Sequence, residues 1–120
     1  MDALSDERFR EGASDVVVRR RAHDQYGSDA GAAAALRRRV PGRPDGDYAA
    51  ALGALFALYD DTVRIVRGSS LCALSPDDGD AYGQAWSEAA DALAASHPGL
   101  ARRSLSSSFV NWARYWHCLR

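Results

Sequence analysis

Lysine is absent from this chain of 120 residues, and all 15 of its basic residues are arginine. Isoleucine, threonine and asparagine each occur once, whereas alanine is abundant. Biased codon usage in a GC-rich genome explains this composition more simply than selection for arginine chemistry does. With 47% apolar and 26% charged residues, the chain has the composition of a globular protein rather than a disordered one.

The motifs of common enzyme and nucleotide-binding sites are also missing. The sequence has no Gly-x-Ser-x-Gly elbow, no Gly-x-Gly-x-x-Gly loop and no P-loop. Its histidines, His23, His97 and His117, lack the i, i+4 spacing of a helical metal-binding face. His97 precedes a proline at a predicted helix end, where we expect the imidazole to satisfy nearby carbonyls.

Two adjacent acids, Asp60 and Asp61, lie in the middle of a predicted helix, where neighbouring side chains point about 100° apart. We expect one of them to face inward beside Arg64, four residues after Asp60, as an ordinary helix ion pair. General acid–base catalysis would need a second group opposite a buried carboxylate, and the sequence offers none. We therefore predict a non-catalytic protein with no cofactor and no metal site.

Only two cysteines are present, Cys72 and Cys118, far apart and outside any metal-ligand spacing. Neither has a convincing local activator, so we expect both to be buried and inert. No hydrophobic segment precedes them at the N-terminus, which favours a reducing cytosol. The longest apolar-rich run, residues 48–59, is too short to span a bilayer. We predict a soluble, cytoplasmic protein with no membrane partner.

Apolar residues recur at three- and four-residue steps between residues 47 and 67, which predicts one long amphipathic helix. Leu58 and Ile65 fall off this stripe and are also apolar, so we expect the helix to have neighbours on more than one side. The stripe consists of Tyr48, Leu52, Leu55, Phe56, Tyr59, Val63 and Val66.

Capping signals predict shorter helices on both sides of the long one. Ser14 begins a predicted helix that ends at Gln25 or Tyr26, and Ser28 begins another that ends in arginines 37–39. Residues 40–46 form a break that contains two prolines and two glycines. Ser75, followed by a proline, begins a helix that ends near residue 96, and residues 100–119 form one helix or two.

These signals together predict an all-α fold. We expect a single compact bundle of four or five helices around the long central helix at residues 47–67. Residues 1–120 are expected to form one helical domain, in which residues 1–13 are a short helical turn or a loosely ordered tail. No stretch alternates convincingly as a strand.

Charge is distributed unevenly along the chain. Residues 1–43 carry nine arginines and seven acids, residues 44–101 carry two and nine, and residues 102–120 carry four and none. Such asymmetry either marks a polar partner surface or is neutralised inside the fold. Arginine triplets on two consecutive predicted helices also invite comparison with nucleic-acid binders. The candidate partner-binding residues in these triplets are Arg19, Arg20, Arg37 and Arg38.

The C-terminal segment is aromatic. Phe109, Trp112, Ala113 and Trp116 make a helical stripe that we expect to pack in the core. Arg114 and Tyr115 lie off this stripe, and they are candidates for a partner or dimer surface because tyrosine, tryptophan and arginine dominate binding hot spots. A third interpretation is a cavity for a small apolar ligand, lined by Phe56, Tyr59, Trp86 and Trp112.

The sequence therefore favours a non-catalytic module that acts through protein contacts, as an adaptor, a regulator or a self-associating bundle. A nucleic-acid-binding regulator and a sensor of small apolar ligands are the alternatives. Nucleic acid is the less favoured partner, because the net charge of −1 is unlike that of a basic nucleic-acid-binding domain.

Overall fold

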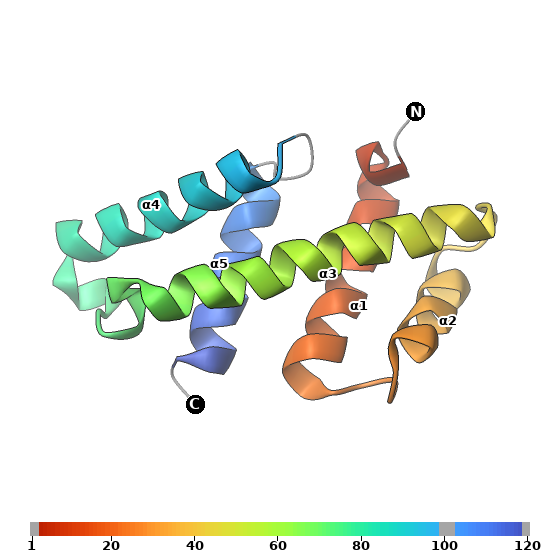
Figure 1. Cartoon of the computed structure of the whole chain (residues 1–120), viewed down its shortest axis with the longest axis horizontal. Coiled ribbons are helices and arrows are strands. Elements are labelled where there is room, and N and C mark those ends of the chain that lie inside the picture. The colour runs from red at the N-terminus through yellow and green to blue at the C-terminus, as the bar shows by residue number, and fades with distance from the viewer. Residues whose placement is uncertain (1–2, 99–102, 119–120) are drawn as a thin grey trace. The chain divides into compact units, whose positions relative to one another are not determined.

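The computed structural model describes residues 3–98 and 103–118, which contain five α-helices and no strand. Three short 3-10 helices connect or precede them. The predicted all-α fold is confirmed, and its longest helix is the predicted central one (Figure 1). In order, the elements are η1 (Ala3–Ser5), α1 (Glu7–His23), α2 (Asp29–Arg39), α3 (Asp45–Gly68), η2 (Ser70–Cys72), η3 (Pro76–Asp78), α4 (Asp80–Ser96) and α5 (Arg103–His117).

The chain divides into two compact units that share α3. Unit 1 is Met1–Ala57 and unit 2 is Leu58–Arg120. Unit 1 has nine arginines and nine acidic residues, and unit 2 has six arginines and seven acidic residues. The uneven charge along the sequence is therefore nearly balanced within each unit. The organisation of residues 1–120 as one domain stays a prediction.

Helix α1 begins at Glu7 because Asp6 caps it and accepts hydrogen bonds from the backbone N–H groups of Arg8 and Phe9. Phe9 is fully buried, so the turns before Ser14 belong to a core helix and not to a loosely ordered tail. The helix start predicted at Ser14 is wrong. A single apolar residue between charged neighbours makes no stripe, so the pattern gave no sign of this burial.

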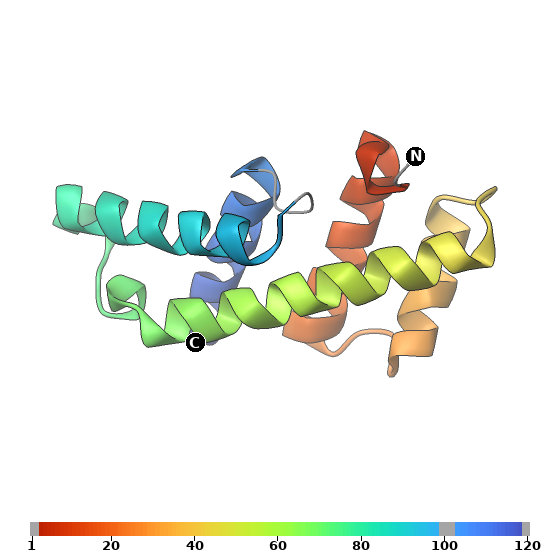
Figure 2. The same cartoon turned by 45° about the horizontal axis from the view of Figure 1, so that its top comes forward.

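Helices α1 and α2 form an antiparallel hairpin, which Figure 2 shows from a second direction. Ser28 caps α2 as predicted and accepts a hydrogen bond from the Gly31 N–H. The turn between the helices uses a positive φ at Asp24, Tyr26 and Gly27. Gly31 approaches this turn so closely that a Cβ there would lie 2.2 Å from the Tyr26 carbonyl oxygen. The hairpin therefore depends on glycine at position 31.

Most of the predicted apolar stripe of α3 is buried, whereas Val63 is half-buried. The buried residues of the stripe are Tyr48, Leu52, Leu55, Phe56, Tyr59 and Val66, and Leu58 is buried as well. In unit 1, the Tyr48 hydroxyl donates a hydrogen bond of 2.6 Å to the Val40 carbonyl, and its ring lies 5.7 Å from that of Phe9. Thr62 is also buried, and its hydroxyl donates to the Leu58 carbonyl at 2.7 Å. This back-bond explains how a polar residue is tolerated in the core.

In unit 2, α4 and α5 pack against each other. Ser75 makes the predicted cap with Asp78, but it caps η3, and α4 starts only at Asp80. Gly79 separates the two elements with a φ of 62°. Residues 103–117 form one continuous helix, which decides between the two arrangements that the sequence left open. The side chain of Trp116 lies outside the described part of the chain.

None of the helices that the structure describes is both long enough and apolar enough to cross a membrane.

Candidate functional site

The arginine triplets of unit 1 are paired with carboxylates of the same unit. Arg19 and Arg39 both contact Asp15, and the Arg19–Asp15 distance is 2.9 Å. Burial acts to raise the pKa of Asp15, but hydrogen bonds from Arg39 and Arg19 outweigh it and hold that pKa below its ordinary value. This arrangement neutralises part of the positive charge that suggested a partner surface.

The other arginines of the hairpin follow the same pattern. Arg20 contacts Asp24 and lies 3.2 Å from Asp29, and Arg37 lies 3.4 Å from Asp45. Arg38 is exposed. Exposed ion pairs contribute little free energy. Nucleic-acid phosphates can therefore compete for these arginines, but they would have to displace the carboxylates that pair with them. The predicted partner-binding arginines of the hairpin therefore lie at the surface, but they do not form a continuous basic stripe free of carboxylates.

Arginines also cover aromatic rings in unit 1. The Arg21 guanidinium lies 4.2 Å from the centre of the Phe56 ring, and Arg43 lies 4.6 Å from the centre of the Phe9 ring. Phe56, a predicted cavity-lining residue, is only 7% exposed beneath this cover. These contacts bury apolar rings under planar cations and so contribute to packing.

Tyr59, the second predicted cavity-lining residue, lies in the core of unit 2. Its ring meets that of Phe109 edge to face at 5.2 Å, and its hydroxyl lies 3.2 Å from His117 Nε2. Burial raises the pKa of Tyr59 to about 12. Burial, with the nearby charge of Arg67, lowers the pKa of His117. Both shifts favour the neutral forms, which suits a buried hydrogen bond between uncharged partners.

The acid pair on α3 meets a group that the sequence did not indicate. His97 Nε2 lies 2.7 Å from Asp61 Oδ2, and Arg64 lies 3.3 Å from Asp61 Oδ1. The expected helix ion pair with Arg64 is thus present, and Asp61 is the acid that makes it. The expectation that His97 bonds to carbonyls is wrong, because its Nε2 meets the Asp61 carboxylate. The hydrogen bond from His97 is the main reason why the pKa of Asp61 is lowered. Since His97 is the C-cap residue of α4, the pair holds the end of α4 to α3.

In residues 3–98 and 103–118, no group of three or more His, Cys, Asp and Glu side chains gathers as a metal ion would require.

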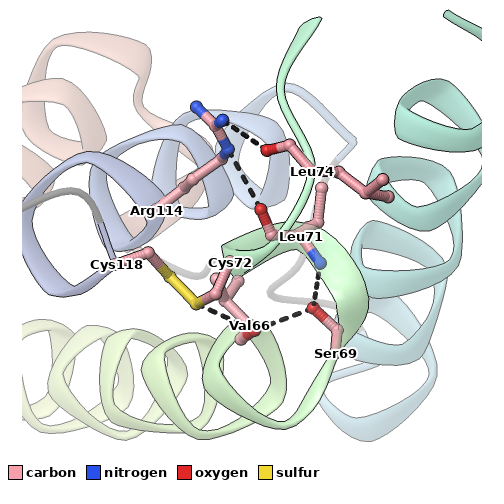
Figure 3. Close-up of a disulfide and its surroundings, with 7 residues drawn as sticks. All are labelled: Val66, Ser69, Leu71, Cys72, Leu74, Arg114 and Cys118. Atoms are coloured by element: carbon pink, nitrogen blue, oxygen red, sulfur yellow. Dashed lines mark hydrogen bonds between the residues drawn. A yellow bond between two sulfur atoms is a disulfide. The ribbon is translucent and has the colours of Figure 1, made fainter. Parts of the chain in front are cut away.

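Arg114, a predicted partner-binding residue, contacts the connection after α3. Its guanidinium donates to the Leu74 carbonyl at 2.7 Å and to the Leu71 carbonyl at 3.3 Å (Figure 3). The same group lies 5.0 Å from the centre of the Tyr82 ring. Arg114 therefore ties α5 to the connection that follows α3.

Trp112 and Tyr115 are the large hydrophobic side chains that remain most exposed among the described residues, at 40% and 55%. Their rings meet edge to face, with centroids 6.5 Å apart. Ser108 and Asn111 share this exposed side of the helix. We call these four residues the α5 aromatic face. It carries no charged side chain.

The exposure of Trp112 corrects the prediction that it packs in the core. Phe109, Val110 and Ala113 are fully buried, so the buried side of α5 is rotated towards Val110 and away from Trp112. Trp86, the remaining cavity candidate, is half-buried and donates its indole N–H to Asn111 Oδ1 at 3.0 Å. The four predicted cavity residues thus lie in different surroundings, and an apolar ligand site stays a prediction.

Cys72 and Cys118 form a disulfide, with their Cα atoms 5.1 Å apart (Figure 3). The expectation of two inert, buried cysteines is wrong, and both residues are half-buried. Their separation of 46 residues gave no sign of the bond, because only the packing of α5 beside η2 brings them together.

The chain matches no family model, no curated protein and no solved structure.

Proposed function

We propose that this chain is a non-catalytic helical module that acts through protein contacts, and that the partner of the α5 aromatic face is a second copy of the chain. The observation that carries the proposal is the exposure of Trp112 and Tyr115, side by side, on a helix whose opposite side is fully buried.

Exposing an aromatic pair to water is unfavourable in free energy, and burying it at an interface contributes binding energy. Tryptophan and tyrosine offer a large contact area with few rotatable bonds, and they are enriched among the residues that contribute most binding energy. The edge-to-face contact between Trp112 and Tyr115 holds both rings in place before a partner arrives, which lowers the entropy lost on binding.

The absence of charge on the α5 aromatic face favours self-association over binding to a charged partner. In a two-fold dimer the same surface meets itself, so a charged surface would repel its copy. The exposed side of α4 carries Asp80, Glu88 and Asp91, and α4 contains no basic residue. The α5 aromatic face has no such obstacle, which supports it as the surface that two copies share.

The test is the molar mass of the purified protein by light scattering over a concentration series. We expect a dimer, and we expect Trp112→Ser with Tyr115→Ser to shift it to monomer while the helical circular dichroism is unchanged. Asp91→Ser, on the exposed side of α4, is the matched control and should leave the mass of the dimer unchanged. A wild-type monomer at every concentration would overturn the proposal.

Two further measurements on the purified protein test the two alternative functions. Absorbance at 260 and 280 nm on the eluting peak reports co-purified nucleic acid, and its loss at high salt would support binding through the arginines of unit 1. A sharp rise in melting temperature with small apolar compounds would support the ligand-sensor alternative.

Cytoplasmic localisation also stays a prediction. Disulfides persist mainly in oxidising compartments, and in the cytosol they are mostly transient or redox-sensing. Measuring whether the Cys72–Cys118 disulfide is oxidised in the protein's own compartment therefore tests this prediction directly.

A further inference from the structure

The one asparagine of the chain, Asn111, lies in the middle of the α5 aromatic face. The residues of this face follow one another along α5 at steps of three, one and three residues, which places them on a single stripe of the helix. All of them are exposed, and the stripe consists of Ser108, Asn111, Trp112 and Tyr115. Asn111 and Trp112 are therefore the two central residues of the face.

A hydrogen bond from α4 fixes the orientation of the Asn111 amide. The indole N–H of Trp86 donates to Asn111 Oδ1 at 3.0 Å. An indole N–H can only donate, so the oxygen of the amide has to face Trp86 and the NH2 group has to point away from it. Trp86 is half-buried, and Ala89 and Ala90 beside it on α4 are buried. The donor is thus carried by a packed helix, and it holds Asn111 in one of its two amide orientations.

The bond to Trp86 uses a small part of the hydrogen-bonding capacity of Asn111. A carboxamide has two N–H donors and two oxygen lone pairs, and the indole occupies one lone pair. The same side chain can therefore donate and accept with a further group at the same time. A second carboxamide in the reverse orientation is the natural complement, because each NH2 group then donates to the oxygen of the other.

Two-fold symmetry brings such a second carboxamide to the centre of the face. In a two-fold dimer, residues close to the symmetry axis meet their own copies. This holds for an axis that runs along α5 and for one that crosses it at the centre of the face. Trp112 has an indole donor and no acceptor, so it cannot form a reciprocal hydrogen bond with its copy. Asn111 can, because it carries both a donor and an acceptor.

We propose that Asn111 selects a second copy of this chain as the partner of the α5 aromatic face, by a reciprocal hydrogen-bonded pair with the partner's Asn111, and that Trp86 is its positioning residue. The inference rests on the self-association proposed above. The rings of the face provide contact area, whereas the amide pair provides discrimination, because any other partner or register leaves buried polar atoms without hydrogen bonds. A single asparagine fixes register and oligomeric state in coiled coils for the same reason.

Opposite charges at position 111 test the reciprocal pair. Asn111→Asp and Asn111→Arg each place like charges against each other in a homodimer, so we expect the dissociation constant of each variant to rise about a hundredfold. An equimolar mixture places a carboxylate against a guanidinium. Its light-scattering mass should return to that of a dimer at concentrations where each variant alone is a monomer. Helical circular dichroism checks that both variants are folded, as the exposure of Asn111 leads us to expect.

Charge changes on α4 are the matched control for this experiment. Ala92 is exposed on that helix, outside the α5 aromatic face. Ala92→Asp and Ala92→Arg should each form dimers as the wild type does, with no gain from mixing them.

A double-mutant cycle tests the positioning role of Trp86. Trp86→Phe keeps an aromatic ring but removes the N–H, so the amide of Asn111 becomes free to turn, and we expect the dissociation constant to rise about fivefold. In a chain that already carries Asn111→Ala, the same substitution should have no further effect on association. A residue that only supports the fold would act equally in both backgrounds. Tyr82→Phe, which removes a polar atom from another half-buried ring of α4, is the control and should leave the dissociation constant unchanged.

The outcomes separate this inference from the function on which it rests. A wild-type chain that is monomeric at every concentration would overturn both. A dimer that tolerates either charge at position 111 would overturn the role of Asn111 and leave self-association standing. Charge variants that dissociate but do not recover on mixing would overturn the reciprocal pair. An equal effect of Trp86→Phe with and without Asn111 would overturn the positioning role of Trp86.

Discussion

Replacing Arg114 by methionine distinguishes a role in stabilising unit 2 from a role in binding a partner. Methionine keeps the length and apolar character of the stem but removes the guanidinium. The structure predicts a loss of stability, because the side chain donates to the carbonyls of Leu71 and Leu74 at 3.3 and 2.7 Å. A residue kept for partner binding alone would lose association and little stability.

The magnitude follows from the contacts that disappear. A hydrogen bond from a charged donor contributes about 1.5–3 kcal/mol, and the contact with the Tyr82 ring adds about 0.5–1 kcal/mol. Arg114 is half-buried, so water replaces part of what is lost. We therefore expect Arg114→Met to lower the stability of unit 2 by about 2–3 kcal/mol, which corresponds to a melting temperature lower by roughly 10 °C.

The assay is thermal unfolding by circular dichroism, with urea unfolding as the second measure. Arg64→Met is the matched control, because Arg64 makes only an exposed pair with Asp61 at 3.3 Å and should cost less than about 0.5 kcal/mol. If both variants melt within a degree or two of the wild type, the bonds to Leu71 and Leu74 do not stabilise the fold. Loss of association in the same Arg114 variant would then favour its predicted role in binding a partner.

Further predictions concern the backbone, the pH dependence and the disulfide. Gly31→Ala should destabilise by about 2 kcal/mol because its Cβ would lie 2.2 Å from the Tyr26 carbonyl oxygen, whereas Gly53→Ala, with no atom within 4 Å, should stabilise by about 0.5–1 kcal/mol. Urea unfolding measures both, and equal effects would contradict the hairpin geometry. The pKa of His117 is lowered below 6.5, so the unfolded chain takes up the proton first, and stability should fall as pH drops below about 6.5 and level off below the folded pKa. His117→Gln should flatten that part of a melting-temperature profile, and an unchanged profile would show that His117 titrates normally. The pKa of Asp61 is lowered below 3.8, so its contribution is present above that value and is lost as pH falls through the folded pKa; Asp61→Asn should remove this acid-limb loss. Closing a chain of 46 residues reduces the entropy of the unfolded state by the equivalent of about 4 kcal/mol, so Cys72→Ser with Cys118→Ser should lower the stability of unit 2 by up to that amount, and an unchanged melting temperature would mean that the bond does not form in solution.

Signals between neighbouring residues were enough to predict the helices and most of the positions where they begin and end. The three- and four-residue spacing from Tyr48 to Val66 placed the longest helix and its buried side, because helical periodicity is a property of neighbouring residues. Ser28 and Ser75 were identified as caps for the same reason, since a capping side chain bonds to its own first turn.

Features that depend on distant residues could not be read in this way. The sequence placed Trp112 on the buried side of α5. In the structure the helix is rotated, so that Trp112 lies at the surface and forms part of the candidate interface. An amphipathic stripe allows several rotations of a short helix, and the packing of α5 against its neighbours selects one of them.

The sequence gave no indication of the His97–Asp61 contact or of the Cys72–Cys118 disulfide, for a related reason. His97 meets Asp61 across 36 residues and Cys72 meets Cys118 across 46, and no pattern of neighbours along the chain encodes either meeting. Composition and periodicity, which depend on each residue and the few beside it, determined that this chain is helical and where its helices lie. The tertiary structure alone decided which aromatic residues stay exposed, which arginines are neutralised and which cysteines bond, because these depend on contacts that form only when segments distant in sequence pack together.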